Sequence, residues 1–132
     1  MSEKNVETLR RGFAAFNRGD LDEAASIFHV DAEWVPYLGT LAGKTHRGRE
    51  AIVRMWADMN LHLSGLHMEL EEFIDAGEII VVVVDATAAG TESGAEVRDR
   101  WAQVWSFSEG LVRRVEPFPS REEALEAAGL SE

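Results

Sequence analysis

The feature that most constrains the fold is an unbroken run of β-branched residues, Ile79 to Val84. β-branched side chains favour strands, and a short apolar run is consistent with a strand covered on both faces. The run is far shorter than the roughly 20 apolar residues that a membrane-spanning helix needs. It therefore predicts a central strand. Asp85 ends the run and points away from the face of Val82 and Val84. It is either a buried functional acid or a polar residue in a subunit interface.

A second predicted strand, Val97 to Phe107, shows a regular alternation. Successive side chains of a strand point to opposite faces of its sheet. Trp101 and Trp105 therefore share a face with Gln103, which lies between them. Asp99 lies on the same face, four residues before Gln103. This spacing predicts a wall made of two indoles and one carboxamide.

Helical spacing and capping residues indicate four helices. The first is predicted to end at Gly19, and Asp20 caps the second. Gly48 precedes the third helix, and the last runs from the capping residue Ser120 to Gly129. The apolar residues predicted to be buried are Val6, Leu9, Phe13 and Phe16 in the first helix, Leu21, Ala24, Ala25 and Phe28 in the second, and Ile52, Met55, Trp56 and Met59 in the third.

The remaining strands are expected at residues 32–36, 67–75 and 111–118, with room for a short one near 40–42. Two helices thus open the chain, and a third precedes four long strands and a final helix. This order predicts an α+β fold. Because no repeat, linker or low-complexity stretch divides the sequence, residues 1–132 are expected to form a single domain.

Composition narrows the function classes. The chain has 132 residues, no cysteine and a formal net charge of −11. The absence of cysteine excludes disulfides, thiolate nucleophiles and cysteine-based zinc sites. An acidic chain with scattered basic residues argues against nucleic-acid and anionic-membrane partners. The polar N-terminus lacks the apolar core of a signal peptide, so a cytoplasmic location is expected.

The aromatic residues are the strongest candidates for a binding site. Four tryptophans, Trp34, Trp56, Trp101 and Trp105, are joined by Tyr37. Tryptophan combines a large apolar surface with one N–H donor, which suits the wall of a small-molecule pocket. Heavy aromatic use in a core and a dimer interface is the alternative.

Few residues suggest acid–base or metal chemistry. Asp99 is either a base whose pKa is raised by burial or an exposed carboxylate paired with Arg98 or Arg100. The histidines show neither helical pair spacing nor an alternating pair, so no metal site is expected. Dinucleotide-binding and serine-hydrolase motifs are missing, and no cofactor is expected.

Several segments together resemble the SnoaL-like branch of the nuclear-transport-factor-two-like superfamily, which includes ketosteroid isomerase and limonene epoxide hydrolase. They are FAAFNRGDLDEAASIF and HVDAEW (within 13–34), HRGREAIVRMW (46–56), VWSFSEGLVRRVEPF (104–118) and SREEALEAAGL (120–130). The resemblance covers nearly the whole chain. It implies a cone-shaped, curved mixed sheet of the cystatin-like type wrapped around an N-terminal helical hairpin and a third helix, with a short C-terminal helix. It also implies an apolar internal cavity and a homodimer packed through the outer sheet face.

The catalytic residues of ketosteroid isomerase are absent at the matching positions. Pro36 stands at the position of its proton-shuttling aspartate, and Gly12 at that of its tyrosine donor. Gln103 replaces its protonated aspartate. Trp56 matches an aromatic residue that backs the isomerase site, and Phe28 falls on another cavity position. The resemblance therefore does not imply isomerisation by that mechanism.

Two other patterns of the superfamily also guide the choice of acids. The epoxide hydrolase has Arg-x-Asp where this chain has Val83-Val84-Asp85. Polyketide cyclases use an aspartate or histidine near the end of the last strand. Here Glu116 is the ionisable residue in that stretch.

The sequence thus predicts a protein that binds a small hydrophobic molecule, with isomerase- or cyclase-type acid–base chemistry by Asp99 and Glu116 if it is an enzyme. The alternative is a non-catalytic dimeric binding or regulatory module. The predicted ligand-binding residues are Phe28, Trp34, Tyr37, Trp56, Val82, Trp101, Gln103 and Trp105.

Overall fold

The computed structural model describes residues 2–36 and 45–130. Its helices are α1 (Ser2–Asn17), α2 (Leu21–Ala25), α3 (Arg49–His62) and α4 (Arg121–Ala127). Its strands are β1 (Phe28–Trp34), β2 (His46–Arg47), β3 (Leu63–Asp75), β4 (Ile79–Gly90), β5 (Glu96–Ser108) and β6 (Leu111–Phe118). Both capping predictions are confirmed, because Asp20 and Ser120 accept hydrogen bonds from the backbone N–H groups of Glu23 and Glu123.

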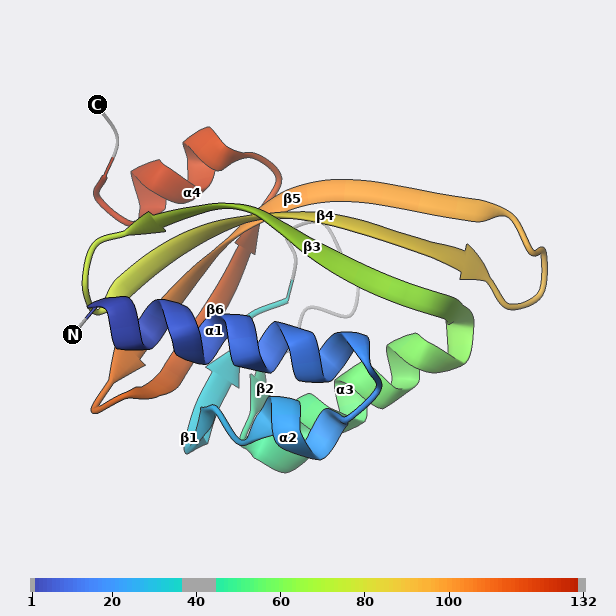
Figure 1. The fold of residues 1–132 in the computed structure, drawn as a ribbon, viewed down its shortest axis with the longest axis horizontal. Coiled ribbons are helices and arrows are strands. Elements are labelled where there is room, and N and C mark those ends of the chain that lie inside the picture. Colours follow the sequence, from blue (N-terminus) through green and yellow to red (C-terminus); the bar gives the residue numbers. More distant parts are fainter. Residues whose placement is uncertain (1, 37–44, 131–132) are drawn as a thin grey trace.

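All six strands form one curved sheet in the order β2-β1-β6-β5-β4-β3. Only the β1–β6 pair is parallel, so the sheet is mixed. Figure 1 shows the long strands β3 to β5 sweeping over α1, α2 and α3, with α4 on the opposite side of the sheet. The predicted α+β class and the helix order are confirmed.

The predicted central strand is also confirmed, since β4 has neighbours on both sides in the sheet and a core on both faces. Ile80, Val82 and Val84 pack with the helices in the larger core. Val81 points the other way, into a smaller core that contains Ala102 of β5. Side chains of α4, among them Ala124, cover this outer core.

Several strand boundaries differ from the prediction, and β4 continues past Val84 to Gly90. β1 begins at Phe28, four residues before the predicted start, because Phe28 is buried and pairs in register with Val112. β3 begins at Leu63, since α3 passes directly into extended backbone there without a loop. The short strand β2 lies at His46–Arg47, whereas the predicted one near 40–42 falls outside the described residues.

Asparagine side chains on α1 fasten the helix to the sheet. Asn17 bonds to both backbone groups of Met68, donating to its carbonyl at 2.9 Å and accepting from its N–H at 2.8 Å. Asn5 donates to the carbonyl of Gly77 at 3.0 Å. β3 is an edge strand, so the Asn17 contact satisfies edge groups that would otherwise be open. These bonds fix α1 over one end of the sheet.

Ion pairs occupy the outer face of the long strands. Arg98 donates to both oxygens of Asp85, at 2.7 and 3.2 Å, and Arg100 lies 2.6 Å from Glu71. Hydrogen bonding by the Arg98 guanidinium lowers the pKa of Asp85 below its usual value. The outward direction predicted for Asp85 is therefore confirmed, and its carboxylate serves an ion pair between strands.

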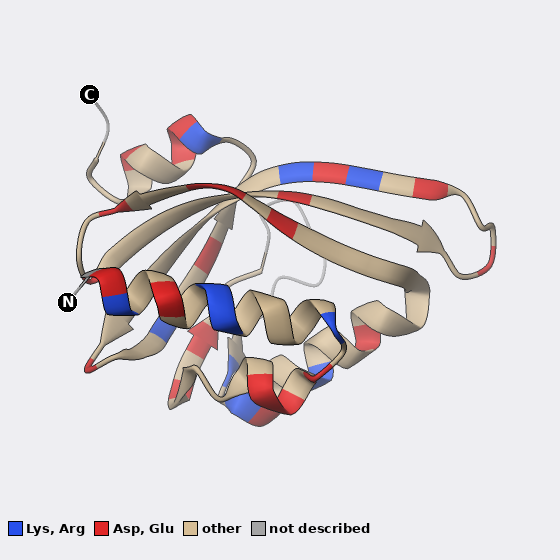
Figure 2. Cartoon of the chain, in the orientation of Figure 1, with Lys and Arg blue, Asp and Glu red and all other residues tan. Residues whose placement is uncertain are grey.

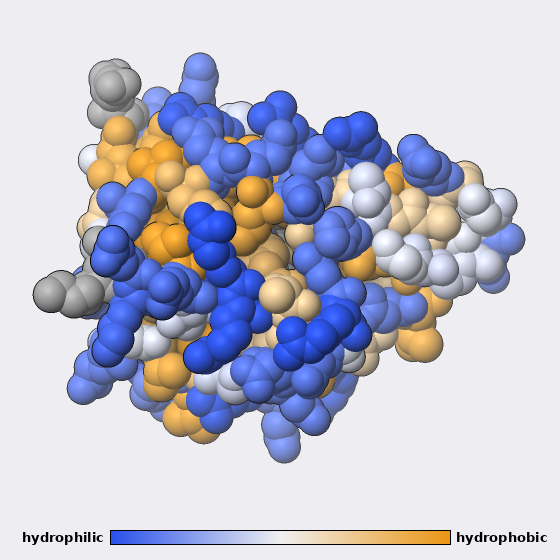
Figure 3. Space-filling view, in the orientation of Figure 1, coloured by the Kyte–Doolittle hydropathy of each residue, from blue (hydrophilic) through white to orange (hydrophobic). Residues whose placement is uncertain are grey.

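The surface carries charges of both signs, which Figure 2 shows interspersed along β5 and the helices. In the view of Figure 3, hydrophilic side chains dominate and apolar atoms appear in patches between them. Of the described residues, Val30, Leu61 and Val97 are the large hydrophobic ones that stand exposed. Within residues 2–36 and 45–130, no helix is long and apolar enough to cross a membrane.

Candidate functional site

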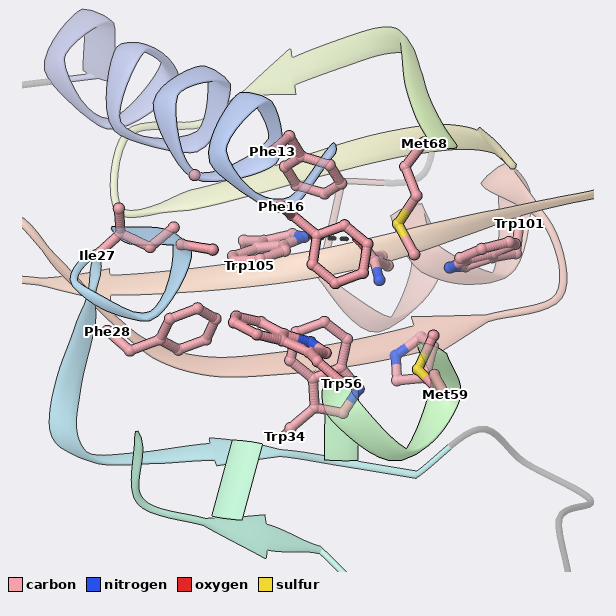
Figure 4. Close-up of a pocket in the computed structure, with 14 residues that line it drawn as sticks. Phe13, Phe16, Ile27, Phe28, Trp34, Trp56, Met59, Met68, Trp101 and Trp105 are labelled. Carbon is pink, nitrogen blue, oxygen red and sulfur yellow. Dashed lines mark hydrogen bonds between the residues drawn. The ribbon is translucent and has the colours of Figure 1, made fainter. Parts of the chain in front are cut away.

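The concave face of the sheet and the first three helices line a cavity of about 200 Å³ (Figure 4). Every element from α1 to β6 except β2 and β4 contributes to its wall. The lining residues are Gly12, Phe13, Phe16, Ala24, Ile27, Phe28, Trp34, Trp56, Met59, Met68, Trp101, Gln103, Trp105 and Pro117. Figure 4 shows Ile27 and Phe28 at one end, where both are sealed from solvent, and Met59 and Trp101 at the other, where both are half-buried. The cavity therefore approaches the surface at the Met59 and Trp101 end.

Aromatic rings in the wall brace one another. Trp34 meets Trp56 and Trp105 almost at right angles, with ring centroids 6.0 and 5.8 Å apart. Phe28 lies 5.7 Å from the rings of both Trp56 and Trp105. Edge-to-face contacts at these distances are the favoured aromatic geometry. The wall is thus held in place before any ligand arrives.

Gln103 brings a polar group into this apolar wall. The residue is 2% exposed, and its Oε1 accepts a hydrogen bond of 3.0 Å from the indole N–H of Trp105, drawn as a dashed line in Figure 4. The alternation along β5 places Trp101, Gln103 and Trp105 on one face, as the sequence predicted. All three line the cavity.

The lining residues within the described part of the chain include no ionisable side chain. The same part of the chain holds no group of three or more histidine, aspartate or glutamate residues close enough to bind a metal ion. General acid–base catalysis needs a titrating group within hydrogen-bond reach of the substrate. The described wall offers shape, aromatic surface and hydrogen-bond donors instead.

Asp99, one of the two predicted catalytic acids, does not line the cavity. It shares the face of Trp101 but is exposed and is not among the lining residues. Its Oδ1 accepts from the backbone N–H of Arg100 at 2.8 Å, and its register partner on β4 is Ala86. The carboxylate therefore stays in solvent, outside the cavity.

Glu116, the other predicted acid, points to the opposite side of the sheet. It pairs with Val104, whose side chain packs in the outer core, and it lies 3.8 Å from Arg114. Its neighbour Pro117 pairs with Gln103 and lines the cavity. The neighbouring residues Glu116 and Pro117 of β6 therefore point to opposite faces of the sheet.

The other predicted ligand-binding residues divide into three groups. Phe28, Trp34 and Trp56 line the cavity together with the residues of β5. Val82 is buried in the core beside Gln103, its register partner, and does not reach the cavity surface. Tyr37 falls outside the described residues.

Several lining residues were absent from the predicted site. Phe13 and Phe16 were recognised only as the apolar face of α1, and their spacing carries no sign of a cavity. Met68 could be assigned only from the register of β3, whose start was misplaced. Pro117 follows from alternation once the facing of Glu116 is known.

Gly12 illustrates how the wall is closed on the α1 side. A Cβ atom at this position would lie 2.5 Å from Cδ1 of Ile27, which is fully buried. The isoleucine therefore takes the space that a side chain at position 12 would need.

The sequence model of the SnoaL-like domain matches residues 9–115. The chain belongs to the SnoaL-like family. Among curated proteins, none is significantly similar to it.

Solved structures share the SnoaL-like fold over nearly the whole chain. A nuclear-transport-factor-two-like protein of unknown function from Burkholderia pseudomallei is 23% identical, with a TM-score of 0.80 over 93% of this chain and 95% of that one. TerC, co-crystallised with polyporic acid, is 24% identical, with a TM-score of 0.79 and coverages of 93% and 98%. A putative SnoaL-like polyketide cyclase from Jannaschia is 19% identical, with a TM-score of 0.78 and coverages of 89% and 85%. At these identities the likeness shows the fold.

Proposed function

We propose that this SnoaL-like domain binds a small, neutral, mainly apolar molecule in the aromatic cavity and uses none of the cavity's described side chains as an acid or base. The observation that carries the proposal is a pocket whose described lining combines seven aromatic side chains with no ionisable group: Phe13, Phe16, Phe28, Trp34, Trp56, Trp101 and Trp105. A ligand with a charge would lose its hydration there without finding an opposite charge.

The size of the cavity favours a compact ligand. A dry cavity of roughly 150 Å³ lined by apolar side chains is known to take up benzene. A volume of about 200 Å³ therefore suits a molecule with one or two rings. The ligand of TerC supports small-molecule binding as a use of this fold.

The test is a calorimetric titration with indane, a neutral bicyclic hydrocarbon. We expect saturable binding at one site, since burial of apolar surface in a preformed cavity drives association. The variant Ala24→Leu should lose this binding, because Ala24 lines the cavity and is buried. Ala14→Leu adds the same groups at an exposed position of α1 and should bind as the wild type does.

Circular dichroism confirms that each variant is folded before its titration is interpreted. If Ala24→Leu does not fold, Met68→Phe offers a second way to occupy the cavity. Absence of indane binding to the wild type, or equal binding to a folded, cavity-filled variant, would reject the proposal.

A further inference from the structure

The bond between Trp105 and Gln103 determines which end of the amide faces the cavity. An indole N–H is only a donor, so it must meet the carboxamide oxygen. The opposite orientation would place two donors against each other. With Oε1 held by Trp105 at 3.0 Å, the NH₂ group of Gln103 is directed elsewhere.

That NH₂ group faces the cavity. Among the described residues it has no hydrogen-bond acceptor, and Gln103 is a lining residue. In the same part of the chain, no side-chain nitrogen or oxygen that is closed off by protein atoms lacks a partner. The unpartnered Nε2 atom is therefore in contact with the open space of the cavity, where a ligand atom can reach it.

The remaining polar side-chain groups of the described wall are also donors. Trp34, Trp56 and Trp101 each contribute an indole, whose nitrogen carries a hydrogen and accepts nothing. Apart from Gln103 Oε1, which Trp105 occupies, the side-chain acceptors in this wall are the thioethers of Met59 and Met68, which accept weakly. The side chains of the wall can thus donate hydrogen bonds to a ligand, but they present only weak acceptors to a donor group on a ligand.

We propose that the cavity selects neutral one- or two-ring molecules that carry a hydrogen-bond acceptor, such as a ketone carbonyl, and that Trp105 sets this selectivity by holding the amide of Gln103 in one orientation. This inference rests on the proposed binding function and adds the chemical class of the ligand. A buried donor left without a partner is costly, so a ligand acceptor that meets it is favoured. A cationic amine would meet donors and no carboxylate, and is disfavoured.

The test compares three molecules of similar shape: indane, 1-indanone and protonated 1-aminoindane. Their dissociation constants are measured by calorimetry on the wild type and on Gln103→Met, which keeps the length of the side chain and removes the donor. We expect the substitution to raise the dissociation constant of 1-indanone by about tenfold, the effect of one hydrogen bond. The dissociation constant of indane should change by less than about twofold. The comparison cancels the different hydration of the two ligands.

The wild type should show no saturable binding of protonated 1-aminoindane. Binding of this cation as tight as that of 1-indanone would overturn the inference. The inference would also be overturned if Gln103→Met lowered the affinities for indane and 1-indanone equally, or lowered neither. In both cases, binding of indane to the wild type would still support the proposed function. If neither indane nor 1-indanone binds the wild type, the proposed function fails first.

Trp105→Phe tests the positioning role separately. Without the indole N–H, the amide can turn its oxygen toward the cavity, so the preference for 1-indanone over 1-indanol, which can also donate, should shrink. An unchanged preference would contradict the role of Trp105. The double variant Gln103→Met with Trp105→Phe also removes the indole N–H that loses its acceptor in the single variant, so it replaces the single Gln103 variant if that one does not fold.

Discussion

At the scale of single residues, the tryptophans of the cavity wall differ in how much packing depends on them. The ring of Trp56 contacts Phe16, Phe28 and Trp34 at centroid distances of 5.4 to 6.0 Å. Trp101 is half-buried at the other end of the cavity. The same residue type thus supports the wall at one position and borders the surface at the other.

Replacing Trp56 by alanine should lower the free energy of unfolding by about 3–5 kcal/mol, the usual effect of removing a buried aromatic side chain. Trp101→Ala is the matched control and should have a clearly smaller effect, because its side chain is already partly exposed. Urea denaturation followed by circular dichroism measures both values. Equal losses would contradict the supporting role of Trp56.

Removing the charge of Asp99 or Glu116 should leave ligand binding unchanged. Asp99 is exposed beyond the cavity, and Glu116 faces the outer side of the sheet. The dissociation constant of indane for Asp99→Asn and Glu116→Gln should therefore stay within about twofold of the wild type, since surface substitutions away from a site have small effects. A loss of tenfold in either variant would place a carboxylate at the ligand.

At the scale of helices and strands, α1 holds the edge of the sheet through Asn17. The side chain satisfies both the N–H and the carbonyl of Met68, a cavity residue. The asparagine therefore joins the end of α1 to the cavity wall, and its loss should affect both.

Asn17→Ala should destabilise the fold by about 2 kcal/mol, because it removes two hydrogen bonds that each contribute roughly 1 kcal/mol. Asn60→Ala, at an exposed position of α3, is the control for the loss of an asparagine from a helix. Hydrogen exchange of the Met68 amide should accelerate only in the Asn17 variant. Unchanged protection of that amide would show that the bond does not hold the strand edge.

The ion pair between Asp85 and Arg98 should make stability depend on pH. Hydrogen bonding by Arg98 lowers the folded-state pKa of Asp85, so the stabilisation is complete above the unfolded-state pKa of about 4. It is lost as the pH falls from there through the lower, folded-state value. Asp85→Asn should flatten this part of the curve of unfolding free energy against pH, and an unchanged slope would contradict the assignment.

Strand patterns in the sequence predicted directions better than positions. The alternation of β5 gave the common face of Trp101, Gln103 and Trp105, yet Asp99 on the same face lies outside the cavity. The face that a side chain points to does not say whether other elements cover that position. Likewise, the facing of Glu116 and Pro117 depends on the pairing of β6 with β5, which no local signal in either strand reports.

Boundaries were missed where no turn residue marks them. β3 starts at Leu63 directly after α3, so glycine and proline signals could not locate it. The nature of the wall was predictable from four tryptophans and one glutamine. The contributions of α1 and of Met68 required the tertiary packing.

At the scale of the whole molecule, one curved sheet separates two cores, and only the inner one contains a cavity. On the outer face, α4 packs against β4 and β5 around Val81 and Ala102. On the inner face, α1, α2 and α3 cover the sheet but leave the cavity between them and β5. The empty space is part of the folded state alone.

Because the unfolded chain has no cavity, a ligand that occupies it should stabilise the whole fold. At a free concentration one hundred times its dissociation constant, the gain is about 2.7 kcal/mol. The urea midpoint of the wild type should rise with indane, while that of Ala24→Leu should not move. A rise of the same size in the filled variant would point to binding elsewhere.

All four tryptophans of the chain border the cavity, and no other part of the described structure carries one. Ultraviolet emission excited at the red edge of protein absorption therefore arises from this wall. The wavelength and intensity of this emission report the polarity and occupancy of the cavity without an added dye. Intrinsic tryptophan fluorescence therefore reports on the cavity, and a quinone or nitroaromatic that enters it should quench this fluorescence.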